Sequence, residues 1–400
     1  MTSPADVVQV QTPSREELVA RAAALVPLLK ENAERIDRDR RIPDEIIAAL
    51  DDAGFFRLSM PKRYGGYESD IRTQVAVTRE LGRGDGSTAW VVGLASSCSW
   101  LAGRYGAQAQ DDVWGSGVPA IICGHADAVG TAIPVDGGYR FSGSWGFSTA
   151  SSHAQWTTIT AKTTDPSGKP AIVQALVPRT ELITKDTWYV TGMRGTGSNT
   201  TVADDVFVPT HRTILVTDPD DDLMRTPFTD EPLFRAAIVP IGCMYLVGSV
   251  LGMANAALEL VSEKARTKGI HGTLYKTQMD APIAQAAIAR AAVTIKSAEL
   301  MIESAGADIM RYAISGEPMP EVLRAELRCE ISWSAREARR AVDGLVSLHG
   351  ASTFAVSNPL ERIYRDILTG SRHAFFNAEI AEEIYGGVRL GTEHRVTTFI

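Results

Sequence analysis

The feature that most constrains the fold is a hydrophobic pattern that changes twice along the 400 residues. Up to about residue 117, and again from about residue 226, apolar residues recur at helical spacing. Between these regions, residues 118–225 form short runs rich in β-branched residues and separated by turn signals. This order predicts an α+β chain that is mostly α, with an N-terminal helical domain (1–117), a central β-domain (118–225) and a C-terminal helical domain (226–400).

Helix start and stop signals divide the two helical regions. Ser14 followed by Glu17 is typical of a capping box, and Pro43 marks a second helix that ends at Gly54. The apolar segment 89–101 predicts a buried helix. After residue 226, four long helical segments with short connections predict a four-helix bundle. These segments cover about 235–268, 280–315, 320–350 and 358–386.

The central region has the signals of a small β-barrel or β-sandwich. Asp136-Gly137-Gly138 lies between two β-type runs and predicts a hairpin turn. Residues 156–160 and 171–177 are further candidate strands. The acidic segment from Asp218 to Asp230 contains a proline and is expected to link the β-domain to the bundle.

Composition excludes several classes of function. A net charge of −8 argues against a nucleic-acid partner, which would require a basic face. No apolar run approaches the roughly 18 residues of a membrane span, and the first residues lack a basic-then-apolar signal segment. The four cysteines are far apart and show no metal-ligand spacing, so we expect reduced thiols, no metal and a cytoplasmic protein.

Several motifs together resemble the acyl-CoA dehydrogenase superfamily of flavoproteins. They are the loop Met60-Pro61-Lys62-Arg63-Tyr64-Gly65-Gly66, the hairpin 136–143, the segment 147–156, Gly192-Met193-Arg194-Gly195-Thr196-Gly197-Ser198, and Leu360-Glu361-Arg362-Ile363-Tyr364-Arg365-Asp366. Each motif is weak alone, but their order and spacing match the family along nearly the whole chain. The resemblance implies the family's fold: helices, a β-domain and a four-helix bundle.

The chain departs from the dehydrogenases at the catalytic base. In that family a glutamate follows the Tyr-Arg-Asp aspartate by eight residues, and here this position is Ala374. Glu379, Glu382 and Glu383 are expected to lie too far along to replace it. His373 stands next to the missing base, as in the oxygenase branch that is similar to 4-hydroxyphenylacetate hydroxylase and to hydroxylases of aromatic polyketides and indoles.

The resemblance implies a reduced-flavin-dependent monooxygenase that hydroxylates a phenol, polyketide or indole through a flavin C4a-hydroperoxide. His373 would orient the substrate and accept its proton, since an imidazole titrates near neutrality. His125 would be a further active-site residue, and Ser148 or Thr149 would donate to flavin N5. The alternative interpretation of these side chains is structural: a hydrogen-bonded helix histidine and solvated strand hydroxyls.

Other positions are assigned to the cofactor by the same resemblance. Arg194, Thr196 and Ser198 would donate to the flavin, while Gly195 and Gly197 allow close approach of the backbone. The alternative for this segment is an ordinary turn.

Two positions after residue 226 would also serve the flavin, and three aromatic side chains elsewhere carry weaker predictions. Arg266 would reach the flavin phosphates, unless it is only a solvated cation at a helix C-terminus. Gly350 matches a position where a neighbouring subunit closes on the cofactor, which implies a homotetramer. Trp90 and Trp145 are expected in the core or a pocket wall, and His153 as a turn cap.

The implied partners are O2, a small aromatic substrate and a separate flavin reductase, because no Gly-x-Gly-x-x-Gly dinucleotide motif follows a predicted strand. FAD is favoured slightly over FMN. Three alternatives stay open: N-oxygenation of an amino sugar, an acyl-CoA dehydrogenase with a displaced base, and a flavin-free binding or scaffold protein.

Overall fold

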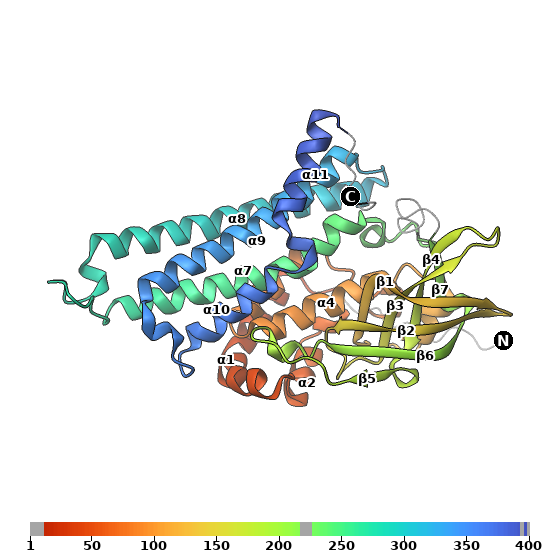
Figure 1. The fold of residues 1–400 in the computed structure, drawn as a ribbon, viewed down its shortest axis with the longest axis horizontal. Helices are drawn as coiled ribbons and strands as arrows, with labels where there is room; N and C mark the ends of the chain where they lie inside the picture. The colour runs from red at the N-terminus through yellow and green to blue at the C-terminus, as the bar shows by residue number, and fades with distance from the viewer. Residues whose placement is uncertain (1–11, 217–225, 393–395, 398–400) are drawn as a thin grey trace.

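The computed structural model describes residues 12–216, 226–392 and 396–397, and places a β-sheet at one end of a helical body (Figure 1). Most of the predicted linker 218–230, and the first residues used to exclude a signal segment, lie outside the described residues. The N-terminal helices are α1 (Arg15–Asp39), α2 (Asp44–Asp52), α3 (Ile71–Gly82), α4 (Gly86–Ala102) and α5 (Ala107–Trp114). The C-terminal helices are α7 (Ile238–Ala265), α8 (Pro282–Ser315), α9 (Glu321–His349), α10 (Pro359–Gly370) and α11 (Ala378–Leu390).

The local signals of the N-terminal region are confirmed. Ser14 accepts from the amide of Glu17, and the Glu17 side chain accepts from the Ser14 amide, so α1 begins with the predicted capping box. Pro43 is the N-cap of α2. The apolar segment 89–101 lies within α4, most of whose residues are buried.

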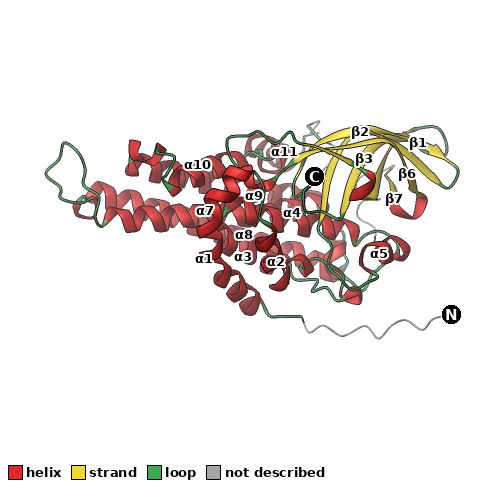
Figure 2. Cartoon of the chain, turned by 90° about the horizontal axis from the view of Figure 1, so that it is seen from below, coloured by secondary structure: helices red, strands yellow, loops and turns green. Residues whose placement is uncertain are grey.

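The central region forms one mixed sheet of seven strands in the order β5-β6-β2-β1-β3-β4-β7. The strands are β1 (Ile122–Val135), β2 (Gly138–Ser148), β3 (Trp156–Thr164), β4 (Pro170–Pro178), β5 (Ile183–Lys185), β6 (Asn199–Pro209) and β7 (Thr213–Val216). The predicted hairpin is present, because Val135 pairs with Gly138 across the β1–β2 turn. The β1–β3 pair is parallel and the other pairs are antiparallel. The sheet curls so that β4 also contacts β6, and it packs over α4 (Figure 2).

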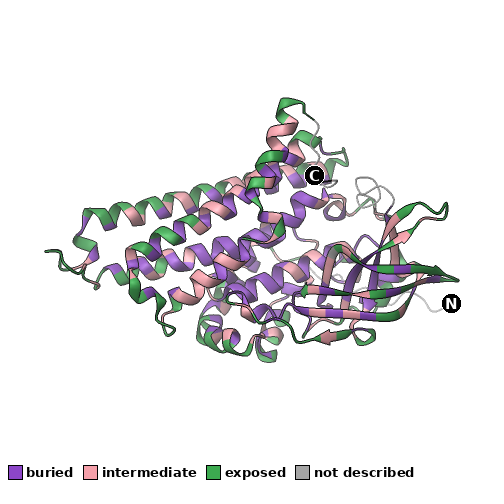
Figure 3. Ribbon diagram, viewed as in Figure 1, coloured by how far each residue is buried: buried purple, intermediate pink, exposed green. Residues whose placement is uncertain are grey.

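Helix α7 is the centre of the bundle and is buried along most of its length (Figure 3). It is long and apolar enough to cross a membrane, although the sequence predicted no membrane span. Its apolar residues instead pack against α3, α4, α8, α9 and α10, so α7 is a core helix. Glycines allow this dense packing: a Cβ on Gly252 would lie 2.3 Å from the Arg79 carbonyl oxygen of α3, and one on Gly93 would lie 2.3 Å from the Tyr245 carbonyl oxygen.

The predicted fourth helix of the bundle, 358–386, is not continuous. It ends at Gly370, and a new helix begins at Ala378, where Asn377 caps the first turn through its side chain. The intervening residues 371–377 contain only a short 3-10 turn, Ala374–Phe376. The helical periodicity runs through this interruption, which explains why the sequence alone did not reveal it.

Candidate active site

His373 lies in the interruption between α10 and α11, where its side chain caps the 3-10 turn. Its Nδ1 accepts from the Phe375 amide at 3.3 Å. The backbone of the same turn is anchored from two bundle helices: the Phe375 carbonyl accepts from Ser332 Oγ at 3.1 Å and from Cys243 Sγ at 3.5 Å. The position of His373 is therefore fixed by α7 and α9 as well as by its own turn.

Aromatic rings surround the His373 imidazole. Ring centroids lie 5.6 Å away for Trp90, 5.2 Å for Phe375 and 6.4 Å for Phe376, all in edge-on arrangements. Burial lowers the pKa of His373 to about 4, and the nearby Asp127 carboxylate only partly opposes this shift. The imidazole is therefore neutral at pH 7.

His125 acts on the same imidazole from the β-domain: a positive charge on its ring would lower the pKa of His373 further, as a minor cause beside burial. It lies on β1 where the pairing with β3 is irregular: Gly124 pairs with Thr158, but the next pair is Ala128 with Thr160. Thr160 Oγ1 donates to the His125 carbonyl at 3.0 Å across this bulge. Bulges redirect side chains and are frequent beside active sites.

The two histidines have complementary hydrogen-bonding capacity. Burial lowers the pKa of His125, while its hydrogen bond to the Gly146 backbone and the charge of Asp127 act in the opposite direction. Its Nε2 is buried and has no hydrogen-bond partner among the described residues, so Nδ1–H is the donor to Gly146 and Nε2 is a bare acceptor. In His373 the acceptor Nδ1 is already used, so Nε2 carries the proton and is a donor.

Ser148 is the last residue of β2 and Thr149 follows it, two and three residues after Gly146. Ser148 is buried, and its Oγ donates to the Trp145 carbonyl at 3.2 Å, which leaves its acceptor capacity unused by that bond. The flanking Phe147 and Ala150 have φ values of 59° and 62°. Non-glycine residues in this left-handed region are strained and cluster at functional sites.

A chain of buried hydroxyls joins this turn to the loop before β6. Ser198 Oγ lies 2.7 Å from both Thr149 Oγ1 and Thr196 Oγ1. Ser151 Oγ donates to the Gly197 carbonyl at 3.0 Å. The residues predicted from two separate motifs are thus in contact with one another.

Arg194 is engaged within the chain. Its Nε donates to the Asp37 carbonyl at 2.9 Å and an Nη donates to the Val190 carbonyl at 3.0 Å. Gly195 is also closely packed, because a Cβ there would lie 2.1 Å from the Ile36 side chain. The predicted role of Arg194 as a flavin donor stays a prediction, and the contacts described here are structural.

Arg266 and Gly350 are the C-cap residues of α7 and α9, and the loop that joins α7 to α8 lies at the opposite end of the molecule from the sheet (Figure 1). Arg266 is exposed and borders a surface cavity of about 290 Å³ between α7 and α8. Lys268 connects the two positions by donating to the His349 carbonyl and to Ser352 Oγ. Both positions lie far from His373 within one chain, because the turn that follows His373 packs on Cys243 and Ser332, several helical turns earlier in α7 and α9.

The remaining predicted positions have structural contacts. Trp145 is in the sheet core and donates to the Thr160 carbonyl at 2.9 Å. His153 is partly enclosed 3.5 Å from Asp44, and burial lowers its pKa to about 4. Over 12–216 and 226–392, no three His, Cys, Asp or Glu side chains are grouped to hold a metal ion.

Sequence reasoning missed Asp366 as a site residue, although the motif containing it was recognised. Asp366 is buried, and its Oδ1 accepts from the Met193 amide at 2.5 Å. A single sequence contains no signal for this contact, because 173 residues separate the two partners.

Comparisons with known proteins agree with this architecture. Residues 12–118 match the family model of the acyl-CoA dehydrogenase N-terminal domain, and residues 244–378 match that of the C-terminal domain. The chain is 32% identical to the flavin-dependent monooxygenase oxygenase subunit HsaA of Rhodococcus jostii, over 93% of this chain and 97% of the relative. It is 31% identical to the FADH(2)-dependent resorcinol hydroxylase oxygenase component of a Rhizobium species, over 96% of each.

A solved structure of XiaF from a Streptomyces species, in complex with FADH2 and glycerol, superposes with a TM-score of 0.89. Its sequence is 34% identical, and the match covers 96% of this chain and 97% of that one. The chain therefore belongs to the family of flavin-dependent monooxygenase oxygenase subunits built on the acyl-CoA dehydrogenase fold.

Proposed function

We propose that this chain is the oxygenase component of a two-component system that hydroxylates an aromatic substrate. The substrate class is a phenol, an aromatic polyketide or an indole, with O2 as co-substrate and reduced flavin supplied by a separate reductase. The observation that carries the proposal is the unpartnered, buried Nε2 of His125, together with the aromatic rings that surround His373. A substrate hydroxyl or ring N–H would supply the missing partner.

Each of the two histidines has its own role in this proposal. His125 Nε2, a bare acceptor, takes the substrate proton and thereby raises the electron density of the ring. His373 Nε2–H donates to substrate and fixes its orientation. The expected role of His373 as proton acceptor is therefore reassigned to His125. Trp90, Phe375 and Phe376 form apolar walls that exclude water.

Reduced flavin, when bound, supplies the electrons that activate O2. Three features of the chain suit it: the strained turn at Phe147 and Ala150, the buried Ser148 beside it, and the hydroxyl chain Thr149–Ser198–Thr196. Since XiaF was solved with FADH2 and the Rhizobium relative is named as FADH(2)-dependent, we assign FAD, with FMN as the alternative.

The flavin test uses rapid mixing. Wild-type protein with anaerobically reduced FAD or FMN is mixed with oxygenated buffer, and flavin absorbance, hydrogen peroxide and hydroxylated product are followed. We expect an absorbance transient distinct from reduced and oxidised flavin, and product formation with simple phenols or indoles. Direct reoxidation in one phase with both flavins, and no product from any aromatic tested, would contradict the proposal.

We further propose that the protein acts as a cytoplasmic homotetramer in which a second copy completes the cofactor site. Within one chain, Arg266 and Gly350 lie several helical turns beyond Cys243 and Ser332, which hold the turn that follows His373. Arg266 borders a surface cavity at the end of α7, where its guanidinium would receive a phosphate-bearing group. Arg266→Glu and His125→Leu are each expected to be inactive alone, and their co-purified mixed oligomers to regain activity in part. Mixed oligomers as inactive as the parents would refute a shared site.

A dehydrogenase with a displaced base is the less favoured alternative. Glu382 forms an ion pair with Arg336 at 2.6 Å, and the described ring contacts of His373 are with Trp90 and Phe375. No observation on this chain favours N-oxygenation of an amino sugar.

A further inference from the structure

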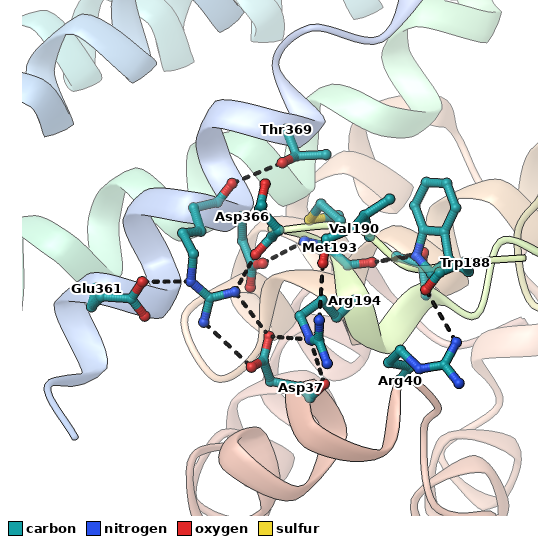
Figure 4. A network of polar contacts seen from close by, with 12 residues as sticks. Asp37, Arg40, Trp188, Val190, Met193, Arg194, Glu361, Asp366 and Thr369 are labelled. Carbon is teal, nitrogen blue, oxygen red and sulfur yellow. Dashed lines mark hydrogen bonds and ion pairs between the residues drawn. The ribbon is translucent and has the colours of Figure 1, made fainter. Parts of the chain in front are cut away.

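The loop before β6 and helix α10 meet directly (Figure 4). The Met193 amide donates to Asp366 Oδ1 at 2.5 Å, and Arg365 donates to the Thr191 carbonyl. The fit is close, because a Cβ on Gly192 would lie 2.1 Å from the Arg365 carbonyl oxygen. This contact joins the β-domain to the bundle at a single turn of α10.

Each partner of this contact is linked to a different part of the proposed active site: the loop to the predicted flavin contacts, and α10 to His373. On the loop side, Thr196 and Ser198 follow Met193 and bond through to Thr149 at the end of β2. On the helix side, α10 ends at Gly370, and the His373 amide donates to the Gly370 carbonyl at 3.1 Å. A displacement at Asp366 would therefore change the distance between the predicted flavin contacts and His373.

Asp366 makes this contact as a buried hydrogen-bond acceptor. It is 3% exposed, and the neighbouring arginine Arg365 is paired with Asp37 and Glu361 instead. Asp366 and Asp85 border a small cavity, of about 10 Å³, together with Arg362. Burial, followed by the charge of Asp85, raises the pKa of Asp366 to about 7. The described contacts thus include a backbone N–H bond but no ion pair at this carboxyl.

We infer that Asp366 is a positioning residue: its bond to the Met193 amide sets the register between the loop that adjoins the predicted flavin contacts and the segment that carries His373. The inference rests on the proposed function for its consequence in catalysis. The structural part of the inference, that the loop depends on one acceptor atom, does not rest on the proposed function.

Two substitutions separate the place of the acceptor from its charge. Asp366→Asn keeps an oxygen at the same distance from the backbone and cannot ionise, while Asp366→Glu keeps an ionisable carboxyl and moves the oxygen by one methylene. We expect Asn to retain the fraction of reduced flavin that yields hydroxylated product within about twofold. Glu should lower that fraction by about 10- to 100-fold, with hydrogen peroxide released instead, because small misplacements cost rate of this order. The reverse ranking would overturn the inference, as would two variants that both behave like wild type.

A second readout does not depend on activity. Amide hydrogen exchange over residues 188–198 is measured on the flavin-free protein, with Asp343→Asn, an exposed α9 carboxylate that binds Tyr364 of α10, as the matched control. Exchange should rise in Asp366→Glu and stay near wild type in Asp366→Asn and in the control. If the Glu protein does not fold, Asp366→Ser, whose oxygen falls short of Met193, replaces it with the same expectation. Unchanged exchange in every variant refutes the inference even where hydroxylation is confirmed, and failure of wild type to hydroxylate leaves this measurement intact.

Discussion

Replacing His125 with leucine is expected to reduce hydroxylation by about 10²- to 10⁴-fold, the usual contribution of a positioned general base. Leucine fills the volume of the imidazole but removes the bare Nε2 acceptor and the bond to Gly146. Oxidation of reduced flavin should continue, so hydrogen peroxide replaces product. The measurement is product and peroxide formed per reduced flavin consumed, at saturating substrate.

The matched control is His153→Gln. His153 is also an enclosed β-domain histidine whose pKa is lowered by burial, but it adjoins Asp44 instead of the site. Its substitution should change hydroxylation by less than about twofold, as for a residue without a role in the reaction. Equal losses in both variants would show that the effect of His125→Leu is structural.

The pH dependence of the wild type follows from the same shift. Because burial lowers the pKa of His125, Nε2 stays an acceptor at pH values below the usual imidazole range. Hydroxylation should therefore decline on the acid side only below about pH 6.5, the ordinary pKa of histidine, and this decline should be missing from the residual activity of His125→Leu.

A folded state that holds fewer protons than the unfolded chain is destabilised as pH falls, so the wild type should also lose stability as the pH falls below that value.

The second large effect is expected at Gly192. Alanine there would place a Cβ 2.1 Å from the Arg365 carbonyl oxygen and 2.5 Å from Thr369 Oγ1, and the first of these atoms belongs to the helix backbone. The loop must move away from α10, so we expect the free energy of unfolding to fall by about 1–3 kcal/mol, the usual cost of overpacking. Chemical denaturation followed by tryptophan fluorescence measures this loss.

Gly344→Ala is expected to change the free energy of unfolding in the opposite direction. Gly344 is inside α9 and exposed, and a Cβ there would meet nothing within 4 Å. Alanine in a helix interior should therefore stabilise the protein by about 0.5–1 kcal/mol. A Gly192→Ala protein as stable as Gly344→Ala would show that the loop does not press on α10.

Local sequence signals predicted much of this fold because their partners are close in the chain. The Ser14–Glu17 capping box, the turn at Gly137 and the buried helix at 89–101 each depend on neighbours within a few residues. The interruption at 371–377 was not predictable in this way. It is held by Ser332 and Cys243, which approach the Phe375 carbonyl from other helices.

The candidate site was predictable in its residue types but not in its roles. Motif resemblance pointed to His373, His125 and Ser148. In the structure His125 influences the pKa of His373, and Ser148 follows Gly146, the backbone partner of His125, by two residues. Which imidazole accepts a proton depends on the partner of the other ring nitrogen, and these partners are a distant backbone carbonyl and a turn amide. Likewise, the partner of Arg194 is Asp37, more than a hundred residues away.

The break between α10 and α11 also bears on how such a protein changes over evolutionary time. Residues 371–377 are held chiefly through main-chain groups: the Phe375 carbonyl is bound by two helices and the His373 amide by Gly370. Main-chain anchors do not depend on which side chains the segment bears. New side chains in this break would therefore alter the ring contacts around His373 while the helices around it keep their packing. Under the proposed function, a change confined to this short segment would let a related chain acquire a new substrate without rebuilding its core.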